Sequence, residues 1–507
     1  MALFRSSDII VVDPRTGLET GAVPCTPAAE VAGLVVRARA AQSAWAKQSL
    51  DERIRVVKQL RGAVLARAED LAGVLVAEIG KPAGEAWTSE IVTAGELFDG
   101  WLDVIEDELA PLPVALNPVN YPGKSVEVEQ DPVGVVGMVM PWNYPVHLPL
   151  RTIVPALLAG DAVVWKPSEH AARCGALLAE IIVSVLPADL VVTVQGGREV
   201  GEALIDAGVD RVVFVGSVPT GRAVARRAAE RLVPVSLELG SKDPAIVLHD
   251  ANLERAVQGI AWGAFHNAGQ DCASVERCYV DTRLHDAFVA RMVAVAGALR
   301  PELDVGPLIN QAALDKVAEH VADALAKGAV LACGGKPTGK GFGFEATVLT
   351  NCTDDMRVVQ EETFGPVLPI LAFSTEDEAV ERANASPYGL CASVWSKDLA
   401  RAEALVRRVD AGVVYVNNCC FTGPMAGAAW SGRKDSGGGV TGSRFALDAL
   451  VRPRTVVIDR SRGAKELWWY PYGEPLVTMA RGLVSLARGS ILRGARLAVT
   501  GLVNRWK

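Results

Sequence analysis

Three residues in this chain of 507 carry groups that could act together on a carbonyl carbon: a thiol, a carboxylate and a carboxamide. Cys272 stands in the segment GQDC, Glu238 precedes it by 34 residues, and Asn143 lies in PWNYP. A thiolate can add to a carbonyl and later leave as a thioester, and a carboxylate can activate the water that hydrolyses it. Taken singly, each residue also has a structural interpretation: a small buried hydrophobe, a strand-end glutamate or a turn asparagine. Glu238 ends the apolar run LVPVSL, where a charge without a function is unexpected.

A second feature indicates a site for a phosphate group. Gly216 and Gly221 follow the run RVVFV and open a predicted helix, whose N-terminus can face a pyrophosphate. Their spacing is not that of GxGxxG and is weak evidence by itself. The segment KPSE (166–169) follows the run AVVW and is either part of the same site or a plain strand-to-helix turn.

The chain resembles the aldehyde dehydrogenase superfamily in four segments that stand in the family's order. They are PWNYP (141–145), ELGSKDP (238–244), GQDC (269–272) and EETFGPV (361–367). Further blocks are KPSE (166–169), FVGS…G (214–221), GPLIN (306–310), ANASPYGL (383–390) and RKDSG (433–437). Each block alone is a weak signal, but the ordered set, which covers roughly residues 20–460, is very specific. The resemblance implies NAD(P)-dependent oxidation of a small-molecule aldehyde to its carboxylic acid.

The resemblance also implies roles for single residues. Cys272 would be the nucleophile that forms a thiohemiacetal and then a thioester, and Glu238 the general base. The Asn143 amide, with the backbone N–H of Cys272, would stabilise the developing oxyanion. The implied cofactor site consists of Trp142, Lys166, Ser168, Glu169, Gly216, Ser217, Gly221, Leu239, Glu362 and Phe364.

The carboxylate of Glu169 bears on the choice between NAD and NADP. Lys166 and Glu169 would reach the adenine ribose, and a carboxylate at the 2′-hydroxyl repels a 2′-phosphate, which favours NAD. Ser168 keeps NADP as the alternative. Glu362 and Phe364 would hold the nicotinamide ribose and ring. No cluster of metal ligands is present in the sequence, and no metal is expected.

The sequence departs from the family pattern at several positions. Asp271 places a carboxylate beside the nucleophile, which would disfavour both the thiolate and an anionic substrate. Val215 and Val218 replace threonines usual near the phosphates. The pocket aromatic is predicted to be Trp430, with Met425 as the alternative alignment.

Two other functions are compatible with the sequence. The first is a dedicated succinate-semialdehyde dehydrogenase, because Arg151 could bind a substrate carboxylate, although His266 stands where a second arginine is expected. The second, from a different class, is an inactive family member that acts as a binding protein. The presence of Cys272, Glu238 and Asn143 argues against it.

The sequence pattern predicts that two α/β lobes position these residues. Valine-rich runs alternate with helical patterns after residue 132 and again after residue 239, as in parallel sheets buried on both faces. The first firm helix is expected near Thr26, capped by its hydroxyl. We expect a cofactor domain (1–113 and 132–238), a catalytic domain (239–437) and a small β arm (114–131 and 438–460). The arm segments KSVEVEQ and VRPRTVVID would join subunits into a homodimer or homotetramer.

The last segment, 461–507, has a different composition. It holds eight Lys/Arg and two Glu, a net charge of +6 in a chain of net charge -8. Trp468 and its aromatic neighbours precede a predicted cationic amphipathic helix that begins at Glu474. Such a segment could contact a membrane surface, although three glycines oppose helix formation. Alternatively, it packs across the dimer or covers the active-site entrance of a neighbouring subunit. The apolar residues expected on one face are Leu476, Met479, Leu483 and Leu486.

Composition sets the remaining limits. The acidic pI near 5.5 argues against a nucleic-acid partner. The nine cysteines form no regular framework, and the first residues lack a signal-peptide pattern, so we expect free thiols in the cytoplasm. Membrane association, if present, would then be at the inner face.

Overall fold

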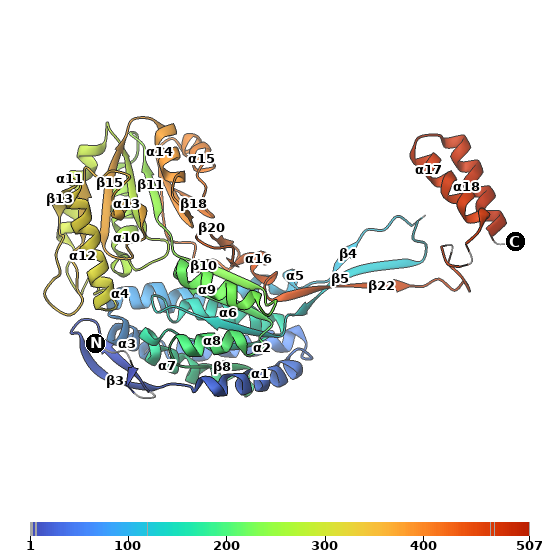
Figure 1. The fold of residues 1–507 in the computed structure, drawn as a ribbon, viewed down its shortest axis with the longest axis horizontal. Helices are drawn as coiled ribbons and strands as arrows, with labels where there is room; N and C mark the ends of the chain where they lie inside the picture. Colours follow the sequence, from blue (N-terminus) through green and yellow to red (C-terminus); the bar gives the residue numbers. More distant parts are fainter. Residues whose placement is uncertain (1–3, 6–7, 119, 467, 471, 506–507) are drawn as a thin grey trace. The chain divides into compact units, whose positions relative to one another are not determined.

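The computed structural model describes residues 4–5, 8–118, 120–466, 468–470 and 472–505. They form two compact units, Met1–Ala110 with Gln130–Arg454, and Pro111–Glu129 with Thr455–Lys507. The first unit contains both large sheets (Figure 1). All nine cysteines are free thiols, as expected.

The chain begins with a small antiparallel sheet that the sequence did not predict. Strand β2 (Asp8–Asp13) pairs with β1 (Phe4–Arg5) and β3 (Leu18–Pro24). The predicted helix start was wrong by five residues, because α1 runs over Val31–Trp45 after a single 3-10 turn. The Thr26 hydroxyl does not cap it and instead accepts a hydrogen bond from the Gln195 N–H at 3.0 Å.

A helical layer follows, as the pattern up to residue 110 predicts. It consists of α2 (Leu50–Ala66), α3 (Ala68–Val74), α4 (Ala83–Ala86) and α5 (Thr93–Glu108), with π-helical turns at Leu75–Ile79 and Trp87–Val92. These turns place Glu78 and Glu90 inside the protein, each 3% exposed or less.

The first large sheet is parallel throughout and has the strand order β10-β9-β6-β7-β8. The helices α1, α8 and α9 contact one another and the sheet, while α2, α6 and α7 form a second group, as a sheet covered on both faces requires. The elements are β6 (Val135–Val139), α6 (His147–Ala159), β7 (Ala162–Lys166), α7 (Ala172–Val183), β8 (Val191–Thr193), α8 (Arg198–Asp206), β9 (Arg211–Gly216), α9 (Val218–Ala229) and β10 (Val235–Leu239).

The second sheet has seven strands in the order β13-β14-β15-β12-β11-β17-β18. It is parallel except at its edge, where β13 (Val330–Cys333) runs antiparallel to β14 (Thr347–Thr350). The sequence patterns missed β14 and β15 (Val367–Phe373). The other elements of the sheet and of the helices around it are β11 (Asp243–Val247), α10 (Leu253–Phe265), β12 (Val275–Asp281), α11 (His285–Ala298), α12 (Gln311–Ala326), α13 (Arg357–Gln360), α14 (Glu376–Asn384), β17 (Cys391–Trp395), α15 (Leu399–Val406), β18 (Val413–Val416) and α16 (Ser443–Leu447). Two separate two-stranded sheets pair β16 (Tyr388–Gly389) with β20 (Arg433–Lys434), and β19 (Trp430–Ser431) with β21 (Val440–Thr441).

The predicted pairing of the two arm segments is confirmed. Strand β5 (Lys124–Pro132) lies between β22 (Val451–Asp459) and β4 (Leu112–Val114). Pro113 lies in β4, which is an edge strand of this sheet and therefore tolerates the missing N–H.

The tail differs from its prediction, because it forms two helices rather than one. Helices α17 (Glu474–Ala487) and α18 (Ile491–Arg505) pack on each other as a hairpin. Gly489, at a φ of 81°, makes the turn between them. The four predicted apolar residues lie on α17, where Met479 and Leu486 contact glycines of α18, so the hairpin partly covers the predicted face, and Leu483 is 37% exposed.

Candidate active site

Four parallel strands of the first sheet end at one edge, and the segments that resemble family blocks follow them. The end of β6 leads into Trp142 and Asn143, and the end of β9 into Ser217. Lys166 ends β7, and Glu238 lies near the end of β10. Strand order reverses between β6 and β9, and ligands of open parallel sheets bind outside the carboxyl ends at such a switch point.

Cys272 lies on the loop that connects α10 to β12. The preceding residues Asn267, Ala268 and Gly269 have positive φ angles of 50°, 57° and 69° and kink the chain before the nucleophile. A Cβ atom on Gly269 would lie 2.2 Å from the Gly365 carbonyl oxygen. This close approach explains the glycine of the GQDC segment.

A buried ion pair holds the loop that carries Glu362 and Phe364. The Lys242 ammonium pairs with the Glu276 carboxylate at 2.5 Å. Glu276 also accepts hydrogen bonds from the N–H groups of Thr363 and Phe364, at 2.7 and 2.8 Å. The Phe364 ring then packs edge-on against Trp142, with ring centroids 5.8 Å apart.

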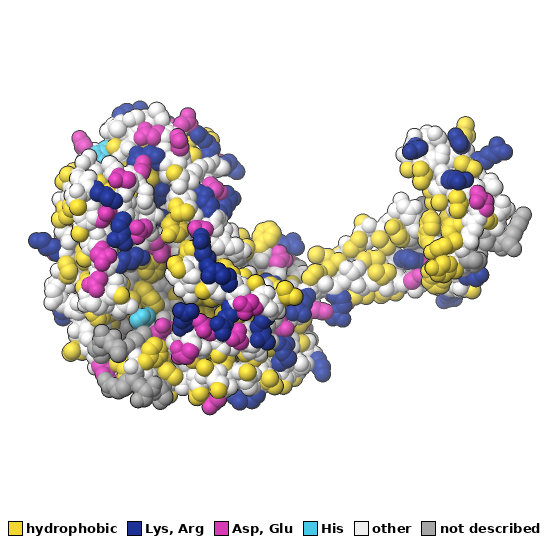
Figure 2. Space-filling view, in the orientation of Figure 1, with side chains coloured by type: hydrophobic (Ala, Val, Ile, Leu, Met, Phe, Trp, Pro, Cys, Tyr) yellow, Lys and Arg dark blue, Asp and Glu magenta, His cyan; other side chains and the backbone are white. Residues whose placement is uncertain are grey.

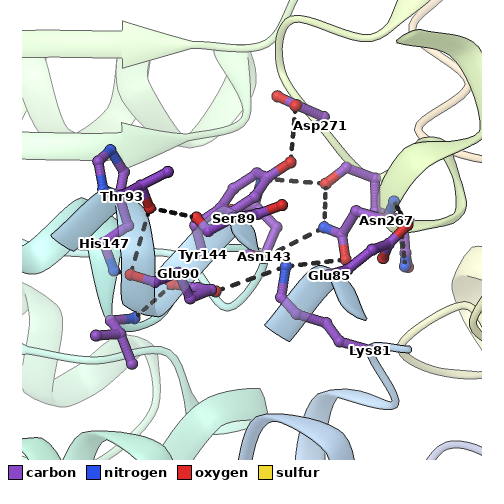
Figure 3. A network of polar contacts seen from close by, with 12 residues as sticks. Lys81, Glu85, Ser89, Glu90, Thr93, Asn143, Tyr144, His147, Asn267 and Asp271 are labelled. Atoms are coloured by element: carbon purple, nitrogen blue, oxygen red, sulfur yellow. Dashed lines mark hydrogen bonds and ion pairs between the residues drawn. The ribbon is translucent and has the colours of Figure 1, made fainter. Parts of the chain in front are cut away.

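A second buried cation joins the N-terminal helices to the loops of Asn143 and Cys272 (Figure 3). Lys81 is 3.5 Å from the Glu90 carboxylate, and both side chains have no exposed surface. Its Nζ donates to Asn267 Oδ1 at 3.1 Å and lies 4.1 Å from the centre of the Tyr144 ring. Glu90 accepts from the backbone N–H groups of Val146 and His147, at 3.1 and 2.9 Å.

The Asn143 side chain is fixed by the same network. Its Nδ2 donates to the Gln270 carbonyl at 3.2 Å, and Asn267 Nδ2 donates to the Asn143 and Gln270 carbonyls at 3.2 and 3.0 Å. One of the two hydrogens on Asn143 Nδ2 stays available to another acceptor. The buried Asn143 amide therefore combines a fixed position with a spare donor.

Cavity A, one of the cavities of the first unit, contains the reactive groups. Cys272 and Glu238 line it together with Arg151, Asp271 and His266. About half of the other lining side chains are apolar, and most of the rest are hydroxyl-bearing or histidine. The apolar ones are Leu148, Val215, Leu239, Trp262, Leu390, Phe421, Pro424 and Trp430. Trp430 is thus the pocket aromatic, as preferred from the sequence, whereas Met425 does not line the cavity and is 45% exposed.

The Cys272 thiol has an environment that opposes its ionisation. Burial raises the pKa of the thiol well above its usual value, and the Asp271 carboxylate raises it further. The Cys272 Sγ lies 3.6 Å from Asp271 Oδ1 and donates to it. The sequence expectation that Asp271 acts against the thiolate agrees with this geometry.

Asp271 is itself held by a chain of hydrogen bonds. The Tyr144 hydroxyl donates to Asp271 Oδ2 at 2.7 Å and lies 3.2 Å from His266 Nδ1, while Ser89 Oγ lies 2.8 Å from His266 Nε2. Since the tyrosine hydrogen goes to Asp271, His266 Nδ1 donates to the tyrosine and Ser89 donates to Nε2. Burial lowers the pKa of His266 to about 4, so its imidazole is neutral at pH 7.

Glu238 is buried without a hydrogen-bond donor among the described residues. Its side chain is 5% exposed, and neither carboxylate oxygen has a hydrogen-bond partner among the residues that the structure describes. Burial raises the pKa of Glu238 well above its usual value, which the Arg151 guanidinium partly opposes. A buried acceptor without a partner costs free energy, which a bound donor such as water would recover.

The predicted cofactor residues line two further cavities. Cavity B includes Trp142, Asn143, Glu238, Cys272, Glu362 and Phe364, together with Gly216, Ser217 and Leu239. Cavity C includes Lys166 and Glu169, whose side chains form an ion pair at 3.3 Å. Because cavities A and B share Cys272 and Glu238, a ligand in each would meet at these two residues.

Two predicted cofactor residues do not line the cavities. The Ser168 hydroxyl accepts from the His170 N–H at 3.3 Å and caps a 3-10 turn. This agrees with the alternative interpretation of KPSE as a plain strand-to-helix turn. A Cβ atom on Gly221 would lie 2.5 Å from a methyl carbon of Leu239, so this glycine allows α9 to approach β10. The backbone of Ser217 begins α9 and lines cavity B, which fits an anionic ligand at a helix N-terminus.

Several residues of the site were not predicted. Lys81 and Glu90 lie on the helical layer, far in sequence from the family blocks, and only their burial reveals them. Lys316 of α12 lines cavity B and adds a cation there. Tyr144 lay within PWNYP, but no sequence signal paired it with Asp271.

Known proteins are similar to this chain over nearly its whole length. The sequence model of the aldehyde dehydrogenase family matches residues 4–456. The 4,4'-diapolycopene aldehyde oxidase of Methylomonas sp is 35% identical over 496 residues, 96% of this chain and 93% of that protein. A betaine aldehyde dehydrogenase of Cereibacter sphaeroides is 37% identical over 464 residues, 89% of this chain and 93% of that protein.

Solved structures are similar in fold. PnpE in complex with nicotinamide adenine dinucleotide has a TM-score of 0.86 and 30% identity, over 90% of this chain and 96% of that chain. The succinate-semialdehyde dehydrogenase of Burkholderia pseudomallei has a TM-score of 0.85 and 34% identity, over 89% and 94% of the two chains. The chain therefore belongs to the aldehyde dehydrogenase family, oxidoreductases that act on aldehydes.

The Lys81→Met variant tests the buried cation. Removing the ammonium leaves the Glu90 carboxylate buried without its counter-charge, which typically costs about 3–5 kcal/mol of unfolding free energy. Thermal unfolding of this variant should begin several degrees below that of the parent. Lys58→Met, at an exposed position of α2, is the control and should unfold with the parent. Equal stability of all three proteins would show that the network does not depend on Lys81.

The Asp271→Asn variant tests the charge beside the nucleophile. Removing the carboxylate lowers the pKa of the Cys272 thiol, since a negative charge no longer opposes the thiolate. Alkylation of Cys272 by iodoacetamide should become several-fold faster at pH 7, and its rise with pH should move to lower pH. Asp286→Asn, on a fully exposed side chain, is the control. Slower alkylation would instead identify Asp271 as the base that receives the thiol proton.

Proposed function

We propose that the chain oxidises an aldehyde to a carboxylic acid through a thioester on Cys272. The observation that carries the proposal is the meeting of cavities A and B at Cys272 and Glu238. The inactive-protein alternative is disfavoured, because a thiol, a buried carboxyl group and a fixed amide remain together at this point.

The residues divide the chemistry as follows. The Cys272 thiol gives its proton through water to the ionised Glu238, which passes it to solvent. The Cys272 sulfur then forms a bond to the aldehyde carbon, while the carbonyl π electrons move to the oxygen. The Asn143 amide and the backbone N–H of Cys272 donate to that oxygen; a preorganised donor of this kind lowers the barrier by roughly 3–4 kcal/mol. NAD, when bound, accepts the hydride that leaves the carbon.

Hydrolysis of the thioester requires a base. In its ionised form Glu238 takes a proton from water as the water oxygen attacks the thioester carbon, and the Cys272 sulfur leaves. Its raised pKa makes the carboxylate a stronger proton acceptor than an exposed glutamate. Arg151 lines the same cavity and favours ionisation of the Glu238 carboxyl group.

For the cofactor we propose NAD, with NADP as the alternative. Cavity C carries Glu169, and a carboxylate that binds a ribose hydroxyl repels a 2′-phosphate. Cavity B offers Glu362 and Phe364 to the nicotinamide ribose and ring. The residues fit the group because cavities B and C line up along the strand ends β6, β7 and β9, with the α9 N-terminus between them. We accordingly assign 1–113 and 132–238 to cofactor binding and 239–437 to catalysis.

For the substrate we propose an apolar aldehyde. Eight apolar side chains, three of them aromatic, line cavity A, Asp271 repels anions, and His266 is neutral. The named substrate of the Methylomonas relative, a diapolycopene aldehyde, supports the same class. That match covers 96% of this chain and must therefore extend into residues 461–507.

One observation favours the second candidate, succinate semialdehyde. Arg151 lines cavity A and could bind a second carboxylate. Its guanidinium lies 5.1 Å from the centre of the Trp430 ring and donates to the Thr441 carbonyl at 3.5 Å. Burial lowers the pKa of Arg151, and the charge of Glu238 opposes this shift. These contacts already use the arginine, so we place this candidate second.

We further propose a homodimer or homotetramer joined by the sheet of β4, β5 and β22. Edge strands of such a sheet normally need a partner.

We also propose a cytoplasmic location, with contact to the inner face of a membrane through residues 461–507. No helix among the described residues is long and apolar enough to cross a membrane.

Two substitutions test the catalytic roles. Cys272→Ser should retain NAD binding and lose turnover, because a serine hydroxyl is a much weaker nucleophile at this pH. Glu238→Gln should release one equivalent of NADH in a burst and then slow by roughly 10²–10⁴-fold, because the thioester persists. Stopped-flow absorbance at the NADH band measures both. Cys333→Ser, on β13, is the control and should match the parent. Parent-like turnover by Cys272→Ala would remove the proposed nucleophile.

A further inference from the structure

The α17–α18 hairpin has an interior of small residues. In its described part, the buried residues are Met479, Gly482, Gly494 and Gly501. A Cβ atom on Gly482 would lie 2.2 Å from the Ala498 backbone nitrogen, and one on Gly501 would lie 2.3 Å from the Met479 nitrogen. The glycines that weaken each helix singly therefore allow the two backbones to touch. Such small-residue contacts between helices are characteristic of packing in lipid, where bulky apolar side chains need not face inward.

Bulky apolar side chains accordingly face outward. Leu492, Val499 and Val503 of α18 follow helical spacing and are 89%, 59% and 49% exposed. On α17, Val477 and Val484 stand two turns apart and are 41% and 56% exposed. Figure 2 shows hydrophobic and basic side chains together on the visible surface of the hairpin. Exposed apolar side chains that gather on one element mark a contact site.

Basic and aromatic residues accompany this apolar face. Arg488 and Arg493 flank the turn between the helices, and Arg496 follows one turn later. None of the three forms an ion pair with any residue that the structure describes. Before the hairpin, Trp468, Tyr470 and Tyr472 are 48%, 74% and 65% exposed. Tryptophan and tyrosine concentrate at the membrane interface, and arginines near an anionic surface each contribute about 1 kcal/mol.

The length of the helices limits how deeply they can insert. With 14 and 15 residues, α17 and α18 are about 21–23 Å long, shorter than the roughly 30 Å of a bilayer core. A hairpin of this length suits the boundary between headgroups and acyl chains, where the apolar face is buried and the arginines stay at the surface.

We infer that the α17–α18 hairpin docks into one leaflet of an anionic bilayer through the face of Leu492, Val499 and Val503. This inference specifies the membrane contact of the proposed function by naming the element, the face and the lipid chemistry. It does not require the proposed roles of Cys272 and Glu238, so a catalytic failure leaves it unaffected.

The test is co-sedimentation of the full chain with vesicles of phosphatidylglycerol and phosphatidylcholine in equal parts. The parent should sediment with these vesicles, and much less with phosphatidylcholine alone. The variant Leu492→Ser/Val499→Ser/Val503→Ser should partition at least roughly tenfold less, since each lost side chain removes apolar burial. The matched control is Val36→Ser/Val183→Ser/Leu232→Ser, at positions 67%, 61% and 90% exposed, and should bind as the parent does.

A second variant guards against misfolding of the hairpin. Arg488→Gln/Arg493→Gln/Arg496→Gln keeps the apolar face and should lose the preference for phosphatidylglycerol. Parent protein that stays in the supernatant with both vesicles would overturn the inference, as would serine variants that bind like the parent. If instead light scattering shows that the serine variant alone loses mass, the face is a contact between copies, and the inference is wrong.

Discussion

The ammonium group of Lys81 is buried at the point where three distant segments of the chain meet, and the geometry of the site depends on it. It pairs with Glu90, which holds the backbone N–H groups at the start of α6, and it donates to Asn267, which holds the carbonyls of Asn143 and Gln270. The distance between the amide of Asn143 and the loop of Cys272 is therefore set by a charge that contacts neither the thiol nor the substrate. A buried pair of this kind contributes little net stability against apolar replacements, and its value is positional.

The same burial that fixes the site opposes the ionisation of its reactive groups. The pKa values of Cys272 and Glu238 are both raised by burial, and only Arg151 lowers that of Glu238. Ionisation of the thiol then depends on what enters the cavities, since a bound cation and a polar carbonyl group change the local field. In this account a low basal reactivity of Cys272 protects the thiol from oxidation between turnovers.

The sequence predicted much of the site and less of the fold. Motif order brought Cys272, Glu238 and Asn143 together correctly, and the valine runs located the parallel strands, because buried parallel strands have a distinctive composition. The strands β14 and β15 were missed, and the antiparallel direction of the edge strand β13 was not predicted, because pairing direction depends on contacts distant in sequence. Lys81 and Glu90 could not be recognised, because nothing local distinguishes a buried charge from a surface one. The tail glycines were counted as a cost, whereas the structure uses them as the contact between two helices.

The most direct test of the account is a comparison of kcat/KM for a long-chain apolar aldehyde and for succinate semialdehyde, each with NAD and with NADP. The apolar side chains of cavity A and the carboxylate of Asp271 predict that the apolar aldehyde is preferred by at least roughly tenfold. The carboxylate of Glu169 predicts that NAD is the better cofactor. A higher kcat/KM for succinate semialdehyde would contradict the proposed substrate class, and oxidation of neither aldehyde would contradict the proposed reaction.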